Sequence, residues 1–376
     1  MMTSHVPPDF FLLAHSHGVA LLDGISKWRE RDTTNKGKKR HTLQRSVSVP
    51  VRQRSIRTPR MIHTSLGASR MPHPNMPDPR LTPRLAQLQS LFESRHRLSS
   101  KLVSRAIESF GNEWAIDFEQ ILSSRFANAD SLAVAANGYA AFAFDSMRRQ
   151  KVFEAVGEYP PKTYAQAASD VYFNEEYMLG EYLPGLLLSH FLWPHHYRQL
   201  QFFDNAFVGA MRVSAAQQFA EVGVGTAVYS QRILSRLPGS TGAGFDISPS
   251  SCHFALAQLE AAGAIERYAM NQQDVIARPI TPVPWLVCVE VLEHLEQPLE
   301  FLMALRKGLA PGGKAFITAA LNAAHADHIH LFRNAEEVWQ HLSAAGFTLE
   351  QSFVAAAYPP PARGVPVPLA AAFIVT

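Results

Sequence analysis

The chain has 376 residues, long enough for more than one core-forming unit, and its 47% of hydrophobic residues is ordinary for a globular protein. Its net charge of +3 comes from one segment, because ten Lys or Arg residues and no acidic residue lie between Asp32 and Asp78. Without that segment the chain is slightly acidic, so the overall charge does not indicate a core that binds nucleic acid or acidic lipid.

Cysteine content and hydropathy exclude two further classes. The two cysteines, Cys252 and Cys288, allow no disulfide framework and fit a reducing cytoplasm. No apolar stretch reaches the length of a membrane span, and residues 10–22 lack the basic start and the cleavage site of a secretory signal. We therefore expect a cytoplasmic protein with no membrane partner.

Residues 1–80 are rich in Arg, Ser, Thr and Pro and are predicted to be a disordered, basic N-terminal extension. Three interpretations remain open: an arm that binds nucleic acid, a transit peptide, or upstream sequence that is not part of the natural protein. We favour the third, because Met61, Met71 and Met76 are plausible later starts.

Residues 81–205 have a helical pattern. Leu85, Leu88, Leu91 and Phe92 form an apolar stripe at helical spacing, and residues 133–144 are almost wholly small or apolar. An aromatic-rich stretch follows, at residues 164–197. Most such aromatic surface is core, but some can line a pocket, so we expect a helical cap domain over a substrate.

From residue 206 onward short apolar runs alternate with helical segments. Strands are expected at 218–222, 242–246, 285–289, 314–319, 348–355 and 369–376, and helices at 227–237, 250–262, 299–310 and 335–345. This alternation predicts an α/β domain, residues 206–376, with a doubly wound, mostly parallel, seven-stranded sheet. The last two strands have no helix between them and are expected to pair antiparallel at the edge.

Chemistry is first indicated where the strand at 218–222 ends. Glu221 is followed by Gly223 and Gly225 in a turn that opens a helix, and glycine there lets a ligand approach the backbone closely. The third glycine of the dinucleotide fingerprint is missing, so this turn alone is also consistent with a purely structural strand-to-helix connection.

Three further features follow at fitting spacings. Asp246 ends the second expected strand, where a carboxylate can accept both hydroxyls of a ribose. Asp274 falls where a third strand should end, within reach of an adenine amino group. The string Glu-Val-Leu-Glu-His at 290–294 ends the fourth strand, and Leu-Ala-Pro-Gly-Gly at 309–313 leads into the fifth.

This ordered set resembles class I methyltransferases that use S-adenosylmethionine (SAM), and the resemblance covers residues 216–376. It implies SAM as the cofactor, with the methionine part held at Glu221 and the two glycines, the ribose at Asp246 and the adenine at Asp274 and Val275. The cofactor-binding residues that we carry over are Glu221, Gly223, Gly225, Asp246, Ile247, Asp274, Val275 and Glu290. One departure is that Pro284 and Trp285 stand where the family usually has an Asp at the start of the fourth strand.

Methyl transfer needs an aligned acceptor, exclusion of water and, for a hydroxyl acceptor, a proton acceptor. The candidate catalytic residues are His294, His328 and Glu293, which follow the fourth and fifth strands. The candidate substrate-binding residues are Tyr177, Tyr182 and His196 of the helical region and His325.

We predict no metal, with one alternative. Glu290, Glu293 and His294 stand at i, i+3 and i+4 and, with His328, could hold a divalent ion. The set is similar to metal-binding positions in small-RNA and ubiquinone-pathway O-methyltransferases. It also occurs in class I enzymes without a metal, where such residues cap helices and brace the cofactor pocket.

The sequence therefore predicts a SAM-dependent methyltransferase that acts on O or N of a small organic molecule, such as a secondary metabolite. The alternatives are a nucleic-acid or protein methyltransferase and a non-catalytic SAM-binding partner protein. The expected partners are a small-molecule substrate and a second copy of the chain, as a homodimer; nucleic acid is not expected.

Overall fold

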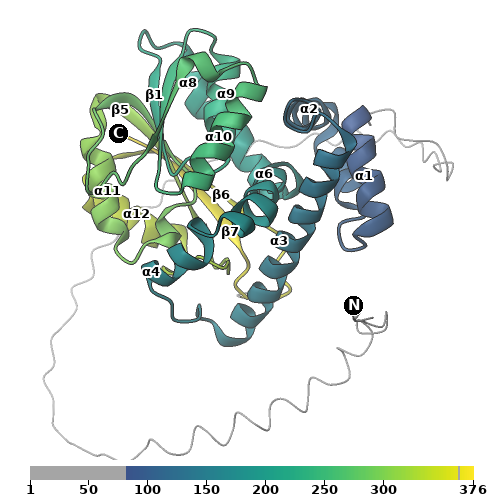
Figure 1. Ribbon diagram of the computed structural model, residues 1–376. Helices are drawn as coiled ribbons and strands as arrows, with labels where there is room; N and C mark the ends of the chain where they lie inside the picture. The colour runs from purple at the N-terminus through teal and green to yellow at the C-terminus, as the bar shows by residue number, and fades with distance from the viewer. Residues whose placement is uncertain (1–81, 363–364) are drawn as a thin grey trace, which may run out of the picture. The chain divides into compact units, whose positions relative to one another are not determined.

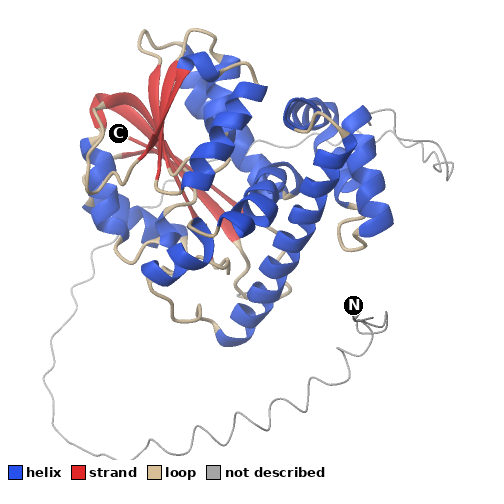
Figure 2. Ribbon diagram, in the orientation of Figure 1, coloured by secondary structure: helices blue, strands red, loops and turns tan. Residues whose placement is uncertain are grey.

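The computed structural model describes residues 82–362 and 365–376, which belong to one compact unit. The predicted basic extension, residues 1–80, lies outside the described residues. The described chain has a helical region, residues 82–212, and a sheet region, residues 216–376 (Figures 1 and 2). None of the described helices combines the length and apolar character that a bilayer crossing requires.

The sheet has seven strands in the order β3-β2-β1-β4-β5-β7-β6. Only β7 runs antiparallel to its neighbours, β5 and β6, and all other neighbouring pairs are parallel. The predicted mostly parallel sheet with an antiparallel pair at its edge is confirmed. The strands are β1 Gln218–Val222, β2 Thr241–Asp246, β3 Tyr268–Gln272, β4 Val283–Cys288, β5 Leu309–Leu321, β6 Leu349–Ala356 and β7 Leu369–Val375.

Helices cover both faces of the sheet, because successive residues of its strands point to opposite faces and apolar side chains lie on both. In β5, Phe316 faces one core and Ile317 the other, and both are fully buried. The Ile317 face is covered by α11 (Pro298–Lys307) and α12 (Ala335–Ala344). The Phe316 face is covered by α9 (Val228–Arg236), by α10 (Pro249–Ala261) and by part of the helical region.

The helical region consists of long helices followed by short ones with π-helical turns. Helix α3 begins with a capping box, in which the side chain of Asn128 accepts from the backbone of Ser131, and it ends at Gly157 with φ of 81°. The elements are α1 Pro83–Arg95, α2 Leu102–Arg125, α3 Ala129–Val156, α4 Tyr164–Ala167, η3 Ala168–Tyr172, α5 Glu175–Tyr177, η4 Met178–Tyr182, α6 Leu183–Leu192, α7 Pro194–Phe202, η5 Phe203–Val208 and α8 Gly209–Arg212.

Glycines let α3 pack closely on η4 and α6, which belong to the aromatic-rich stretch of the sequence. A Cβ at Gly138 would lie 2.3 Å from the carbonyl oxygen of Gly180, and one at Gly185 would lie 2.4 Å from Cβ of Phe142. These distances are too short for any side chain, so glycine is required for the contact. The contact brings Phe142 of α3 against Tyr182 of η4 and against Trp193, which follows α6.

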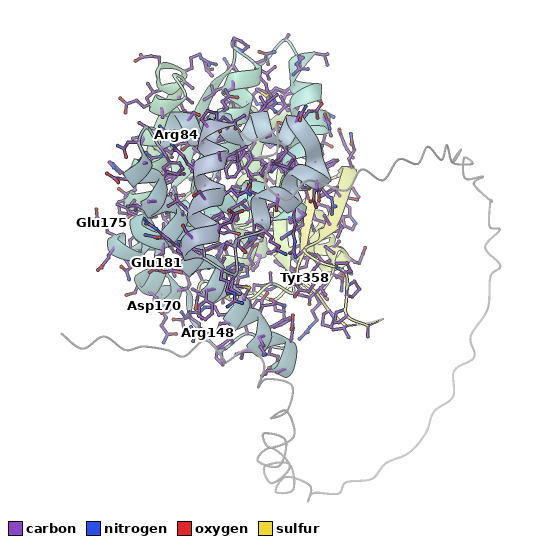
Figure 3. All side chains as sticks on the ribbon, turned by 90° about the vertical axis from the view of Figure 1, so that its right-hand side faces the viewer. Arg84, Arg148, Asp170, Glu175, Glu181 and Tyr358 are labelled. Atoms are coloured by element: carbon purple, nitrogen blue, oxygen red, sulfur yellow. The ribbon has the colours of Figure 1, made fainter. Side chains whose placement is uncertain are left out.

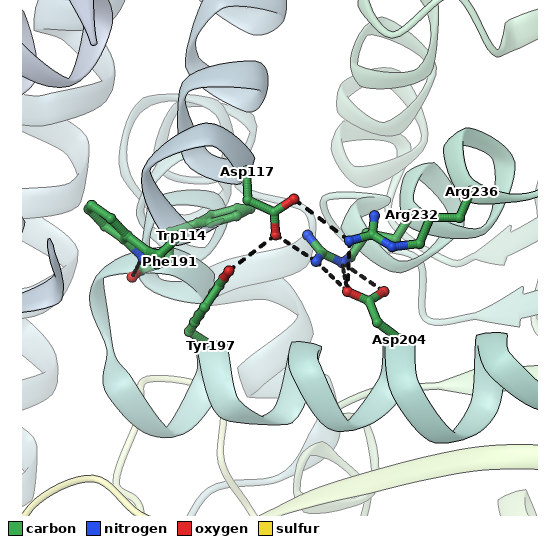
Figure 4. Close-up of polar contacts among 7 residues, drawn as sticks. All are labelled: Trp114, Asp117, Phe191, Tyr197, Asp204, Arg232 and Arg236. Carbon is green, nitrogen blue, oxygen red and sulfur yellow. Dashed lines mark hydrogen bonds and ion pairs between the residues drawn. The ribbon is translucent and has the colours of Figure 1, made fainter. Parts of the chain in front are cut away.

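A buried ion-pair network joins the helical region to the sheet region (Figure 4). Arg232 of α9 is 4% exposed and donates to Asp204 of η5 and to Asp117 of α2, the latter at 2.7 Å. Arg236 reaches Asp204 at 2.9 Å from a more exposed position. Tyr197 of α7 also donates to Asp117, at 3.3 Å. Three helical elements of the helical region are thus tied to one helix of the sheet region.

Helix α3 also contacts the loops at the carboxyl ends of β5 and β6. The amide of Gln150 donates to the carbonyl of Asn322 at 3.1 Å and accepts from the backbone N–H of Ala324 at 3.0 Å. Tyr358, in the loop after β6, donates to Glu154 at 2.8 Å. Figure 3 shows Tyr358 beside the helical region, whose outer face presents exposed charged side chains: Arg148, Asp170, Glu175 and Glu181.

Candidate active site

The glycine turn lies between β1 and α9. Gly223 and Gly225 have φ of 73° and 51°, a region that glycine adopts at little cost. A Cβ at Gly223 would lie 2.4 Å from Cγ2 of Val291, so the turn and the loop after β4 approach closely. The N–H of Gly223 donates to the carbonyl of Phe245 at 2.8 Å, which holds the turn against the end of β2.

Glu221 is 2% exposed and lies beside the first turn of α9. Its Oε2 accepts from the backbone N–H of Ser230 at 2.9 Å and from the Ser230 hydroxyl. Burial raises the pKa of Glu221 to about 8, although these hydrogen bonds oppose the shift. A cationic ligand group beside Glu221 would offset this effect of burial and favour the ionised carboxylate.

Asp246 and Asp274 occupy the ends of the next two strands. One Asp246 oxygen accepts from the N–H of Gly225 at 3.0 Å and the other from the N–H of Ser248 at 2.9 Å. Asp274 accepts from the N–H of Ile276 at 2.8 Å. These bonds fix each carboxylate against its own loop and leave lone pairs for a ligand.

A cavity of about 900 Å³ extends from these strand ends to the helical region. It is lined by every predicted cofactor-binding residue: Glu221, Gly223, Gly225, Asp246, Ile247, Asp274, Val275 and Glu290. Glu293, His294, His325, His328, Tyr182 and His196 line it too. Tyr177 does not; its ring packs against that of Tyr182, with centroids 6.0 Å apart. Ligand binding by these residues stays a prediction.

Two loops are joined at the far end of the cavity. The carbonyl of Glu293 accepts from the N–H groups of Ile329 and His330, at 2.8 and 2.9 Å. This contact fixes the short helix η7 (Leu292–His294) against the loop after β5. Candidate residues from two distant sequence segments are thereby brought to one place.

The two glutamates at this end have different surroundings. Glu290 has φ of 52°, and its carboxylate accepts from the Thr318 hydroxyl at 2.7 Å. Glu293 is fully buried, and neither of its carboxylate oxygens accepts a hydrogen bond. Burial raises the pKa of both groups, and the proximity of Glu290 raises that of Glu293 further. A buried carboxyl group without a donor requires a proton or a cation nearby.

Asp327 is fully buried behind His294. It accepts from the hydroxyls of Tyr182 and Tyr172, at 2.7 and 3.2 Å, and one of its oxygens lies 3.3 Å from Nδ1 of His294. Burial opposes ionisation, but His294, His328 and Tyr182 lower the pKa of Asp327 to about 2. The carboxylate therefore orients the His294 ring, a role that the sequence pattern did not predict.

The two remaining histidines of this end are also held in place. Nδ1 of His328 lies 2.7 Å from the carbonyl oxygen of Ala323, and Nδ1 of His325 lies 3.1 Å from the Ser146 hydroxyl. Burial lowers the pKa of His325 to about 4, so its ring is neutral at pH 7. Ligand atoms of Glu293, His294 and His328 lie within 4.8 Å of one another.

Several residues that line the cavity were not among the predicted site residues. His190 and His195 line the wall beside the predicted His196, and Leu186 lies 3.7 Å from the position of a Cβ at Gly225. Tyr164 also lines the cavity. Burial raises the pKa of its hydroxyl, and the charges of Asp274 and Asp246 raise this pKa further. The helical region thus reaches the glycine turn, whereas the motifs alone indicated that only residues after 216 form that end.

A family model described as a methyltransferase domain matches residues 220–315. This match spans the glycine turn, both aspartates and the loop after β4, in the strand order found above. Residues 220–315 therefore carry a methyltransferase domain, and its mostly parallel, seven-stranded sheet matches the class I fold. No curated protein sequence matches the chain.

The chain is similar to many solved structures, and three of them serve as examples. PigF, solved with SAH, has 14% identity and a TM-score of 0.45, over 64% of this chain and 73% of its own. The mitomycin 7-O-methyltransferase MmcR has 14% identity and a TM-score of 0.43, over 64% and 71%. The [4+2]-cyclase SpnF has 18% identity and a TM-score of 0.36; 43% of this chain matches 62% of the cyclase.

The residues of the methyltransferase domain fit the cofactor that the family implies. The glycine turn presents backbone without side chains to the cavity, beside the buried Glu221. The Asp246 carboxylate suits a ribose diol, and the apolar Val275 lies next to the Asp274 loop, as an adenine ring requires. Glu221, Asp246 and Val275 would therefore hold the methionine, ribose and adenine parts of SAM.

Proposed function

We propose that the protein transfers a methyl group from SAM to an oxygen or nitrogen atom of a small organic molecule. The observation that carries this proposal is one shared cavity, lined both by the cofactor set and by Glu293, His294, His325 and His328. Side chains of α3, η4 and α6 form part of its wall, which favours an acceptor small enough to be enclosed.

The reaction needs little covalent participation from the protein. SAM supplies an electrophilic methyl carbon whose bond to sulfur breaks with its electron pair remaining on sulfur. The acceptor's lone pair forms the new bond, and the acceptor's proton passes to a base. That base is the ring of His294, which Asp327 orients, while the neutral ring of His325 accepts a hydrogen bond from the acceptor and the aromatic wall excludes water.

Incubation of the full-length protein with methyl-labelled SAM tests this proposal. The acceptors are a panel of phenols and aromatic amines, with bulk RNA and a protein extract in parallel. We expect label in at least one small molecule and a loss of an order of magnitude or more in His325→Phe with SAM affinity unchanged. Label in RNA or protein alone would contradict the proposal, and SAM binding without any transfer would favour a non-catalytic partner protein.

A second candidate is the same transfer assisted by a divalent metal. Glu293, His294 and His328 supply one carboxylate and two imidazoles, a donor set that suits first-row transition metals better than Mg²⁺ or Ca²⁺. Asp327 and the Ala323 carbonyl each engage the Nδ1 atom of one histidine, which leaves Nε2 for a ligand. Glu290 is held by Thr318 and is not needed.

Cobalt titration of the chelator-treated protein tests this second candidate without any turnover. We expect one Co²⁺ per chain with visible d–d absorption, and its loss in Glu293→Gln and His328→Ala. The matched control is His330→Ala, because the His330 ring packs on Phe332 and His341 instead. Absorption that survives in both variants, or that disappears in the control, would contradict the metal site.

A further inference from the structure

Three histidines from α6 and α7 line the cavity. His190 is near the end of α6, and His195 and His196 are in the first turn of α7. The rings of His195 and His196 lie 4.3 Å apart, and those of His190 and His196 lie 5.7 Å apart. None of the three has a role in cofactor binding, and none is needed for the proposed proton transfer.

Two of these rings carry an unpartnered polar atom. His190 and His195 are 5% and 7% exposed, and Nδ1 of each makes no hydrogen bond. A buried polar atom without a partner is unfavourable by about 1–3 kcal/mol, so proteins rarely keep one unless a ligand satisfies it. Nδ1 of His196, in contrast, lies 3.3 Å from the Ser189 hydroxyl.

The charge of the cavity restricts what these histidines can bind. Burial lowers the pKa of His190 and of His195 to about 3, so both rings are neutral and each offers one donor and one acceptor. Among the described Lys and Arg residues, only Lys151 lines the cavity, whereas Glu221, Asp246, Glu290 and Glu293 all do. An anionic group would be repelled, whereas a neutral hydroxyl or carbonyl group would be accommodated.

A layer of aromatic rings connects the three histidines to His325. Phe142 stacks on Trp193, with centroids 5.7 Å apart and planes 20° apart, and Trp193 stacks on His195 at 5.9 Å and 11°. Phe142 also stacks on His325 at 5.6 Å. Each of these side chains lines the cavity. These rings give this part of the cavity an apolar, aromatic lining, which suits contact with an aromatic ring of a ligand.

We infer that His190, His195 and His196 form a recognition site for a neutral polar substituent of the methyl acceptor. The acceptor is then a planar, uncharged aromatic molecule with a hydroxyl or carbonyl group on the edge away from the methylated atom. That the ligand is a methyl acceptor rests on the proposed function. The three histidines form a ligand site whether or not methyl transfer follows.

Calorimetry on the full-length protein with SAH present tests the inference. The probes are 2,7-dihydroxynaphthalene and 2-naphthol, which share one ring system and differ by a hydroxyl on the far edge. We expect the diol to bind about tenfold more tightly to the wild type, the effect of hydrogen bonds to buried unpartnered groups. His190→Leu and His195→Leu should bring the two affinities within about twofold of each other, with the affinity for SAH unchanged.

Two further variants keep the outcome decisive. His195→Gln retains a polar side chain and should recover part of the preference for the diol, even where the leucine variant is unstable. His253→Leu replaces a histidine of α10 outside the cavity wall and should leave the preference intact. Equal affinities for the two probes in the wild type, or a preference that persists in both leucine variants, would overturn the inference. Because no turnover is measured, a failed methyl-transfer assay leaves this result interpretable.

Discussion

Four carboxylates are buried where β1, β2, β4 and β5 end, and their partners differ. Glu221, Asp246 and Asp327 accept hydrogen bonds from backbone, Ser or Tyr donors, whereas Glu293 accepts none. Each was removed from water at a considerable free-energy cost, which only donors, protons or cations offset. Because all four lie at the carboxyl ends of the strands, this end of the sheet suits ligands with amino or hydroxyl groups, or a metal ion.

Asp246→Ala is expected to weaken SAM binding by about 1–3 kcal/mol, the range for losing a charge-assisted hydrogen bond from a ribose hydroxyl. The variant also removes the acceptor of the Gly225 N–H. Calorimetry with SAM measures the effect, and Asp130→Ala, an exposed aspartate in the first turn of α3, is the control. Unchanged affinity in a folded Asp246→Ala protein would contradict the ribose assignment.

The start of α1 depends on a side chain from α2. The Glu119 carboxylate accepts from the N–H groups of Arg84 and Leu85, at 3.1 and 3.0 Å, and from the Thr82 hydroxyl. These are first-turn N–H groups without a helical partner, and no side-chain cap at Thr82 satisfies them. Helix α1 is therefore capped through tertiary structure, which a local sequence pattern does not show.

This cap makes the stability of α1 depend on pH. Burial would raise the pKa of Glu119, but the hydrogen bonds from Thr82, Ser123 and the α1 backbone lower it below its ordinary 4.5. A lowered folded-state pKa stabilises the fold above the unfolded value, and this stabilisation is lost as the pH falls through the folded value. Glu119→Gln should therefore lower the melting temperature at pH 7, with the difference shrinking below about pH 4.5.

The matched control for this prediction is Glu113→Gln, which changes an exposed glutamate of the same helix. It should leave the melting temperature nearly unchanged at both pH values. A Glu119→Gln effect that is the same at pH 7 and at pH 3 would show that the charge is not what caps α1.

Across the whole chain, the sheet and the helical character of residues 82–212 were predictable, whereas the individual contacts between the two regions were not. Apolar runs bounded by glycines and capping residues predict five of the parallel strands and the helices between them. For β1 the predicted and the observed bounds are the same, 218–222. For strand β3 the sequence predicted only where the strand ends. Most of its residues are half-buried or exposed, and polar residues interrupt the apolar run that would have marked its start. Its pairing with β2 supplies the order that its sequence lacks.

The site divides in the same way. Residues of the glycine turn and the strand ends were predicted, because their backbone requirements leave a pattern in the sequence. The roles of Gln150, Asp327 and His190 were not predicted, because they come from contacts with segments far away in the chain. Gln150 bonds Asn322 across 172 residues, and no local spacing encodes such a contact.

The buried ion pairs of Arg232 are expected to hold the two regions together. Arg232→Ala leaves Asp117 and Asp204 without their main partner and should destabilise the protein by about 3–5 kcal/mol. Arg236→Ala, one turn further along α9, removes a more exposed partner of the same two carboxylates and should have an effect of about 0–1 kcal/mol. Chemical denaturation measures both, and equal effects would contradict a special role for the buried arginine.

We expect one cavity to hold SAM at the glycine turn and the acceptor beside the histidines. A crystal structure with S-adenosylhomocysteine would show where each part of the cofactor lies. The ribose hydroxyls should lie within hydrogen-bond distance of Asp246, the adenine beside Val275, and the sulfur atom should be turned toward His294 and His325. Density for the nucleoside outside this cavity, or a sulfur atom turned away from those histidines, would rule out this arrangement.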